Sequence, residues 1–212
     1  MLLIWLVASV GTASVLYVSP SGGGHACKEA EPCALATAVS IISAPNTTIM
    51  FYDGEYYVNE TIVVRDRALA LRAVRMVVWP PPVTLWSEVA VTLRARNSSI
   101  ELYGLHTTAQ ADELGGFDMT TSTLVAITGC LFTRLDGANS ASAVVVGVHP
   151  GGTLSVRDSA FIGNGPLGLR VSRTAVFVSP MPIRRDLAGA NGNYECVAVA
   201  LLLEALMVSV AA

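Results

Sequence analysis

The chain has 212 residues, of which 52% are hydrophobic and only 14% are charged, against about 25% charged residues in a typical soluble domain. This length is enough for one domain with a sizeable core. The net charge of −3 and the dispersed arginines exclude the basic stripe that nucleic-acid binding requires, so we expect no nucleic-acid partner.

The chain opens with an apolar stretch that has the pattern of a secretory signal peptide. Residues 2–10 form a short apolar core, and Gly11 and Ala13 supply the small residues needed for cleavage after Ala13. The stretch lacks the usual positive charge before its apolar core, and a buried first strand or helix is the alternative. We therefore expect residues 1–13 to be a signal peptide.

A cysteine pair and a short helix are the first features of the expected domain. Cys27 and Cys33 flank a short acidic loop in a chain expected to enter an oxidising compartment, which favours a disulfide. A zinc site would need further Cys or His ligands at suitable spacing, and a redox motif would be Cys-x-x-Cys. We therefore expect no metal and no cofactor, and two free thiols remain the other alternative. Residues 33–43 predict an alanine-rich helix that ends at the Ala-Pro-Asn segment 44–46.

The rest of the chain consists of short β-branched runs separated by turn clusters. The expected strands are 48–52, 60–64, 68–74, 75–79, 89–95, 99–104, 123–129, 142–148, 153–159 and 167–172. Because no helical segments separate these runs, a βαβ layout is excluded, and a sandwich, a barrel or a β-solenoid remains.

Internal repeats favour the solenoid. Segments 99–108, 123–133 and 153–163 superimpose, and Leu71 fits one step earlier than Leu102. The expected columns are Ile100, Val125 and Leu154; Leu102, Ile127 and Val156; Gly104, Gly129 and Asp158; Thr107, Phe132 and Phe161. Stacked coils bury a continuous inward row that one coil cannot bury alone. We expect about five coils over residues 14–180, and an antiparallel sandwich is the alternative.

The first coil of a solenoid exposes both an apolar end and an unpaired strand edge. We expect the segment 27–43 to form an N-terminal cap, whose helix covers both and whose disulfide fixes the entry to that helix. Cys130 falls within a coil and is expected to be a small buried core residue, whereas Cys196 is expected to be unpaired.

The C-terminal end consists of a polar linker at 181–195 and an apolar segment at 196–212. This segment is near the lower length limit for a membrane helix, and Glu204 in its middle is unfavourable in hydrocarbon. The small residues at 188–190 also fit a lipid-anchor signal, although the polar spacer after them is short. A membrane helix, a lipid-anchor signal, a core or capping helix and the end of a partial gene product all remain open.

Three N-glycosylation sequons agree with a secretory route. Asn46, Asn59 and Asn97 each begin an Asn-x-Ser/Thr tripeptide without a central proline, although such tripeptides also occur in ordinary turns. We therefore expect a glycoprotein that is secreted or lies on the extracellular face of the plasma membrane.

The N-terminal region resembles right-handed parallel β-helix proteins of the pectin-lyase-like superfamily. The resemblance rests on the strand and turn at 17–22, the Cys…Pro-Cys pair, the helix after it, and the Asp-Gly-Glu-Tyr turn at 53–56. The subgroup with the cysteine pair is similar to protist surface proteins of the polymorphic outer membrane protein type, whose Phe-x-x-Asn repeat occurs here at 161–164. The resemblance covers about residues 15–175 and implies a right-handed parallel β-helix.

Enzymes of that superfamily gather several acids around Ca²⁺ or pair two carboxylates for glycoside cleavage. In this chain the acids do not recur in stacked columns. Segment 65–67 (Arg-Asp-Arg) and the pair at 157–158 lie next to turns, where exposed Arg–Asp pairs are usually solvated. The best carboxylate pair, Asp112 and Glu113, lies in a glycine-containing loop. We assign no catalytic residue, and a polysaccharide lyase or glycoside hydrolase remains the alternative function.

One aromatic segment is a candidate for glycan contact. Trp79 and Trp86 bracket three prolines in a stiff loop, which could stack on sugar rings or cover the core between coils. We therefore expect a non-catalytic, adhesin-like or glycan-binding role, with glycans or surface proteins as partners. Membrane attachment through the C-terminal segment stays one of the open alternatives. A partial or degenerate gene product without activity is a further alternative.

Overall fold

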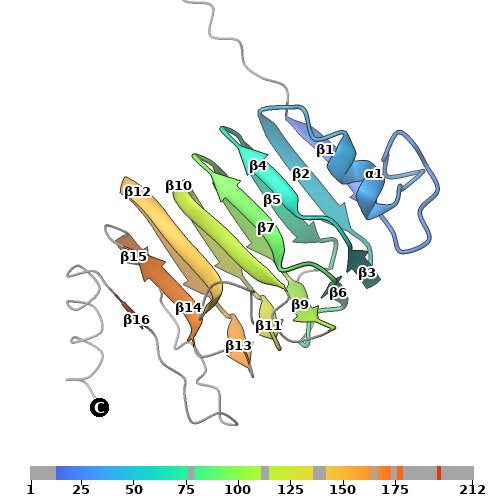
Figure 1. Cartoon of the computed structure of the whole chain (residues 1–212). Coiled ribbons are helices and arrows are strands. Elements are labelled where there is room, and N and C mark those ends of the chain that lie inside the picture. Colours follow the sequence, from blue (N-terminus) through green and yellow to red (C-terminus); the bar gives the residue numbers. More distant parts are fainter. Residues whose placement is uncertain are drawn as a thin grey trace, which may run out of the picture.

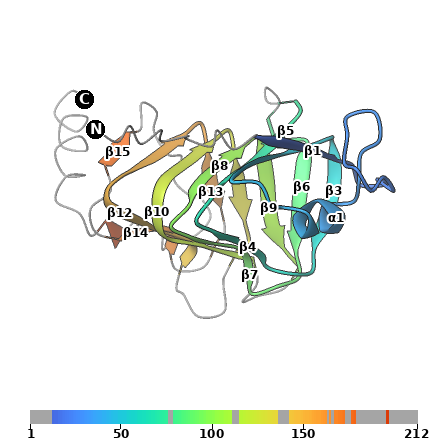
Figure 2. The same cartoon turned by 90° about the horizontal axis from the view of Figure 1, so that it is seen from above.

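The protein is a parallel β-helix. The computed structural model describes residues 13–75, 79–110, 115–135, 142–162, 164, 167–172, 176–178 and 195–196, with the backbone alone at 121, 142–151, 167–172, 176–178 and 195–196. Within these residues every pairing between strands is parallel, which excludes the antiparallel sandwich. In Figures 1 and 2 the colours pass from blue to orange along the stack of strands, so successive coils follow one another along one axis.

Two sheets enclose the core. The longer sheet has, in spatial order, β1 (Ser14–Val18), β2 (Asn46–Phe51), β5 (Ala68–Ala73), β8 (Ser99–Tyr103), β10 (Gly116–Thr128), β12 (Ser142–Arg157), β14 (Leu167–Ser172) and β16 (Glu195–Cys196). It also includes β4 (Ile62–Arg65), β7 (Val91–Arg96) and β15 (Val176–Val178). The second sheet has the order β13 (Ala160–Ile162), β11 (Leu131–Thr133), β9 (Leu105–Ala109), β6 (Val83–Ser87) and β3 (Gly54–Val58).

The predicted inward columns are confirmed by the strand register. Val125 pairs with both Ile100 and Leu154, and Ile127 pairs with both Leu102 and Val156. Leu71 pairs with Leu102, as the repeat predicts. All these side chains are buried, because alternate residues of each strand point inward and like positions of successive coils stack.

The third predicted column, of Gly104, Gly129 and Asp158, lies at a turn of each coil. Gly104, Gly129 and Asp158 have φ angles of 63°, 61° and 49°, so each coil turns through the left-handed region at the same place. Glycine adopts this conformation without steric cost, and aspartate tolerates it better than most residues.

The Phe-x-x-Asn segment joins one coil to the coil before it. Phe161 stacks on Phe132, as the fourth predicted column requires. The Asn164 amide donates a hydrogen bond to the carbonyl of Phe132 (3.0 Å) and accepts one from the backbone N–H of Leu135 (3.0 Å). The asparagine therefore satisfies two backbone groups of the preceding coil at a turn where the sheet ladder ends.

The N-terminal cap differs from the predicted one. The helix α1 (Leu35–Ser40) is shorter than 33–43, because Ala34 is extended and supplies no side-chain cap and Ile41 leaves the helical conformation. This helix buries Leu35 and Ala38 and contacts β1 and β3, so it covers the apolar end of the first coil.

The disulfide loop, and not the helix, covers the strand edge. Cys27 and Cys33 form the predicted disulfide and are both fully buried. The N–H of Tyr17 donates to the carbonyl of Cys27 (2.8 Å), and the N–H of Cys33 donates to the carbonyl of Tyr17 (3.0 Å). The expectation that one helix solves both problems is therefore wrong, because a helix has no free backbone groups along its side with which to pair a strand.

Several predicted strand boundaries are also wrong. The expected strands 142–148 and 153–159 fall on one strand, β12, and 123–129 is only the second half of β10. The expected turn at 53–56 instead begins β3, where Gly54 has a φ of 137° and a Cβ would lie 2.5 Å from the Pro20 side chain. The described residues form a solenoid of about four turns.

Some predictions fall outside the described residues. These are the signal peptide apart from Ala13, the middle of the expected strand 75–79, and the linker and C-terminal segment apart from the backbone of 195–196. In the part of the chain that is described, no helix is long and apolar enough to cross a membrane.

Candidate functional site

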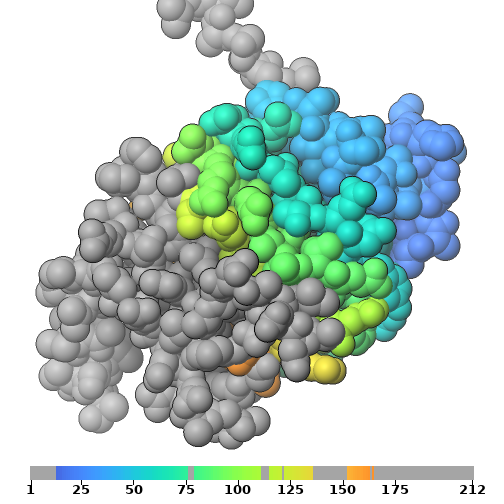
Figure 3. Space-filling view, viewed as in Figure 1, coloured from blue at the N-terminus to red at the C-terminus, as the bar shows by residue number. Residues whose placement is uncertain are grey.

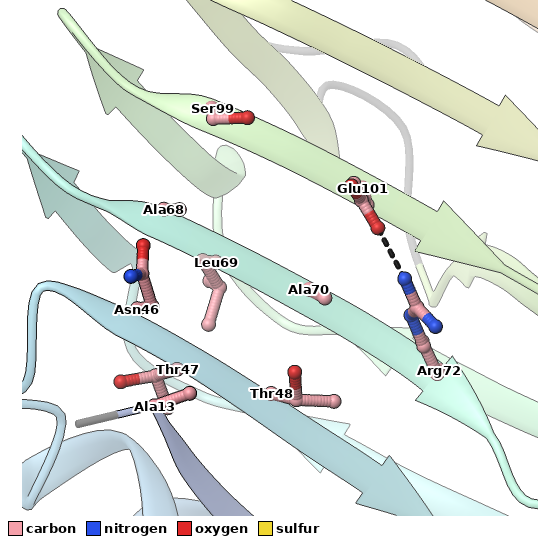
Figure 4. Close-up of a pocket in the computed structure, with 10 residues that line it drawn as sticks. All are labelled: Ala13, Asn46, Thr47, Thr48, Ala68, Leu69, Ala70, Arg72, Ser99 and Glu101. Carbon is pink, nitrogen blue, oxygen red and sulfur yellow. Dashed lines mark hydrogen bonds and ion pairs between the residues drawn. The ribbon is translucent and has the colours of Figure 1, made fainter. Parts of the chain in front are cut away.

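An open groove lies on the outer face of the longer sheet, over β2, β5 and β8 (Figure 4). Its volume is about 190 Å³. The lining residues are Ala13, Asn46, Thr47, Thr48, Ala68, Leu69, Ala70, Arg72, Ser99 and Glu101. Small-molecule pockets usually start at about 300 Å³, so this groove has room for one unit of a longer ligand rather than for a whole enclosed ligand.

The alternation of side chains along three parallel strands builds this groove. Thr48, Ala70 and Glu101 are register partners on the outward side, and Arg72 and Tyr103 are register partners two residues further on. Alanine at 70 leaves the middle strand without bulk between longer neighbours, which makes the hollow. Polar groups therefore surround a small apolar floor.

An ion pair with an aromatic ring closes one end of the groove. The guanidinium of Arg72 donates to the carboxylate of Glu101, and its carbon lies 4.5 Å from the centroid of the Tyr103 ring. Both charged side chains are about one third exposed, and Nε of Arg72 is buried without a hydrogen-bond partner. The aromatic contact and the ion pair fix the arginine in one orientation. The groove thus presents a fixed carboxylate and fixed N–H donors side by side.

The two tryptophans of the predicted glycan contact lie before and within β6. Trp79 is 54% exposed and precedes β6, whereas Trp86 lies near the end of β6 with its side chain half-buried. The register partner of Trp86 is Tyr57 on β3, which is 55% exposed. The indole N–H of Trp86 is buried and has no hydrogen-bond partner. Sequence reasoning missed Tyr57, although it precedes Trp86 by 29 residues, the same offset that separates Ile127 from Val156.

Two of the acid–base residues singled out in the sequence, Asp66 and Arg67, form hydrogen bonds with neighbouring segments. Asp66 accepts a hydrogen bond from the amide of Asn97 (3.3 Å), and Arg67 donates to the carbonyl of Ile42 (2.9 Å). Asp112 and Glu113 lie outside the described residues. Among the side chains that are described, no group of three or more His, Cys, Asp or Glu could hold a metal ion.

Burial shifts the pKa values of two side chains, those of His106 and Cys130. His106 is partly buried on β9, and its Nε2 lies 2.8 Å from the hydroxyl of Thr133. Burial lowers the pKa of His106, because it disfavours the charged imidazolium. Cys130 is buried as predicted, and burial raises the pKa of its thiol to about 12, so the thiol stays protonated at neutral pH.

All three sequon asparagines are accessible at the surface. Asn46, Asn59 and Asn97 are exposed, so their side chains are open to modification. Asn46 lines the groove together with the sequon residue Thr48, whereas Asn59 and Asn97 are not among the lining residues. A glycan on Asn46 would therefore start inside the groove.

No protein family and no curated protein matches this chain. Among solved structures, the alginate lyase AlyGC of family PL6 is similar, with 14% identity over 85% of this chain and a TM-score of 0.48. The pectate lyase Pel9A is similar with 11% identity over 87% of this chain and a TM-score of 0.38. This chain spans 31% of the first protein and 58% of the second. Identities this low concern the fold alone and say nothing of a substrate.

Proposed function

We propose that this β-helix is a non-catalytic carbohydrate-binding protein, secreted or attached to a cell surface, that holds one unit of a glycan in the groove over β2, β5 and β8. The observation that supports the proposal is the fixed group of Arg72, Glu101 and Tyr103 beside the alanine floor. An ion pair at the surface contributes little to the stability of the fold. The Arg72–Glu101 pair, which lines the groove in one orientation, is therefore better explained by a role in binding.

The chemistry of the groove suits a sugar. A sugar hydroxyl both donates and accepts, and Glu101 accepts while Arg72 donates. The hydroxyls of Thr48 and Ser99 and the amide of Asn46 can do both. Ala68 and Ala70 give an apolar floor for the C–H face of the ring. A small groove that is open to solvent lets a longer glycan continue on either side.

The enzymatic alternative is a lyase or hydrolase acting on the same class of ligand. It requires acids gathered around a cation, or two carboxylates placed for glycoside cleavage. In the described residues, Glu101 is the one carboxylate that lines the groove, and its nearest charged partner is Arg72. No observation favours this alternative over binding.

A binding assay that also monitors product separates the two functions. The secreted chain is applied to a glycan array with Ca²⁺ and with chelator, while reducing and unsaturated sugar ends are measured. We expect binding without product. Ala70→Leu, which fills the floor, should abolish binding, and Glu101→Gln should weaken it about tenfold. Ala36→Leu, on the exposed side of α1, makes the same change outside the groove and should have no effect.

Three results would contradict the proposal. Calcium-dependent product would show an enzyme. Equal binding by the Ala70→Leu and Ala36→Leu variants would show that the glycan binds outside the groove. The surface around Tyr57 and Trp86 would then be the next to test. No binding to any glycan would leave the groove without this role.

A further inference from the structure

Three arginines gather on the outer face of β4, β7 and β10, away from the groove. Arg65 on β4 is the register partner of Arg96 on β7, so their backbones lie about 4.8 Å apart. Arg94 lies two residues before Arg96 and therefore on the same side of the strand. Asp118 on β10 is the register partner of Arg94. Figure 3 shows teal and green atoms of β4 and β7 at the surface of this side of the molecule. We call Arg65, Arg94 and Arg96 the arginine face.

The arginine face has an excess of positive charge. Among the described residues, Asp118 is the carboxylate that forms ion pairs with these arginines. Its Oδ2 lies 2.9 Å from Nη2 of Arg96 and 3.7 Å from Nε of Arg94. Its other oxygen, Oδ1, is buried without a hydrogen-bond partner. Arg65 is exposed, and no ion pair joins it to a carboxylate of the described residues. Three guanidinium groups thus share one carboxylate in a protein whose net charge is −3.

The exposure of the arginines leaves their donors open to a ligand. The side chains of Arg94 and Arg96 are 46% and 43% exposed, so part of each is open to solvent. Each guanidinium presents a planar fork of N–H donors that matches the oxygens of an anion. Val63, beside Arg94 on β4, is 50% exposed and gives an apolar surface next to the charges.

We propose that the arginine face binds a sulfated polysaccharide. A sulfate ester has three acceptor oxygens and stays ionised throughout the physiological pH range, so one group can bridge the paired forks of Arg65 and Arg96. The arginine face has three positive charges and the one negative charge of Asp118. This surplus of two matches a ligand with repeated anionic groups better than a single anion. This proposal does not depend on ligand binding in the groove, because different strands form the two surfaces.

The test measures binding of dextran sulfate to the full chain by isothermal titration calorimetry, with uncharged dextran and polygalacturonate as comparison polymers. We expect dextran sulfate to bind, uncharged dextran not to bind, and the affinity to fall as salt screens the charges. The double variant Arg65→Gln/Arg96→Gln should lose at least about tenfold in affinity. Arg75→Gln, which removes an arginine that is 73% exposed elsewhere and paired with Asp53, is the matched control and should change the affinity little.

A substitution that should increase the affinity complements the arginine variants, because a loss of folding cannot produce tighter binding. Asp118→Asn removes the carboxylate that pairs with Arg94 and Arg96, so it should raise the affinity for dextran sulfate. Asp53→Asn makes the same change in net charge and releases Arg75, but outside the face, and should not raise it. Equal effects of the two substitutions would overturn the proposal. Tighter binding of polygalacturonate than of dextran sulfate would overturn the choice of sulfate as the ligand group.

Discussion

The rings of Phe132 and Phe161 are stacked face to face on neighbouring coils, with centroids 4.8 Å apart and planes 7° apart. Both side chains are buried, and Phe117 packs edge-on against Phe132 with centroids 5.5 Å apart. Phe132 therefore joins three separate parts of the chain, since it contacts an aromatic ring on each side. This stack fills the interior between β10 and the second sheet.

Phe132→Ala should lower the free energy of unfolding by about 3–5 kcal/mol, because it removes a buried ring and leaves a cavity between two other rings. Equilibrium unfolding in urea measures this loss. Phe132→Leu keeps most of the volume and should cost clearly less. If the alanine variant were destabilised by less than the leucine variant, the stack would not be the support that its geometry indicates.

Reduction of the Cys27–Cys33 disulfide should lower the free energy of unfolding by about 2 kcal/mol, the value expected for closing so short a loop. The loop also carries the backbone groups that pair with the edge of β1, so hydrogen exchange at the amide of Tyr17 should speed up on reduction. Unfolding with and without reductant, followed by exchange measurements, checks both effects. The double variant Cys27→Ala/Cys33→Ala should be insensitive to reductant, and Cys130 should stay unreactive in both folded proteins because it is buried.

Tyr56 should make the stability of the protein depend on alkaline pH. Its hydroxyl shares one proton between the carbonyls of Tyr52 (2.7 Å) and Val18 (3.0 Å). Burial, followed by the charge of Asp53, raises its pKa above the ordinary value of 10.0. The folded state therefore holds this proton more tightly than the unfolded state. Its contribution to stability is complete below pH 10 and is lost as the pH rises above that value.

Tyr56→Phe should remove this part of the alkaline loss and cost about 1–2 kcal/mol at neutral pH through the missing hydrogen bonds. Urea unfolding from pH 7 to pH 11 measures both quantities. Tyr57→Phe, one residue away on the exposed side of β3, is the matched control and should change neither. An unchanged alkaline dependence in the Tyr56→Phe variant would rule out the ionisation of this residue as its cause.

A glycan on Asn46 should block the groove, because this asparagine and its sequon partner Thr48 both line it. This prediction rests on the proposed binding function and on a secretory route. In protein from a glycosylating host, Asn46→Gln should raise glycan binding, whereas Asn59→Gln and Asn97→Gln should leave it unchanged. In unglycosylated protein Asn46→Gln should give no gain. A gain there as well would mean that the asparagine side chain itself, and not an attached glycan, obstructs the groove.

The repeat spacing in the sequence was enough to predict which side chains point into the core and which of them stack on one another. The columns of Ile100, Leu102 and Gly104 and the stack of Phe132 on Phe161 all follow from superimposing three segments. Burial imposes this pattern, because every second side chain must be apolar and each coil must place its apolar side chains over those of the coil before it. The disulfide was predictable as well, because the two cysteines flank a short loop in a chain that is expected to enter an oxidising compartment.

Only the tertiary structure shows which side chains meet on the outer surface. Outward side chains are under no demand for burial, so apolar periodicity does not show which of them meet. The hollow at Ala70, the contact of Arg72 with Glu101 and Tyr103, and the pairing of Arg65 with Arg96 depend on strand register and on side-chain direction together. The covering of the β1 edge by a cysteine loop depends on backbone hydrogen bonds, which leave no mark in residue type. Sequence therefore set the core of the solenoid, and packing set the surfaces through which we expect it to act.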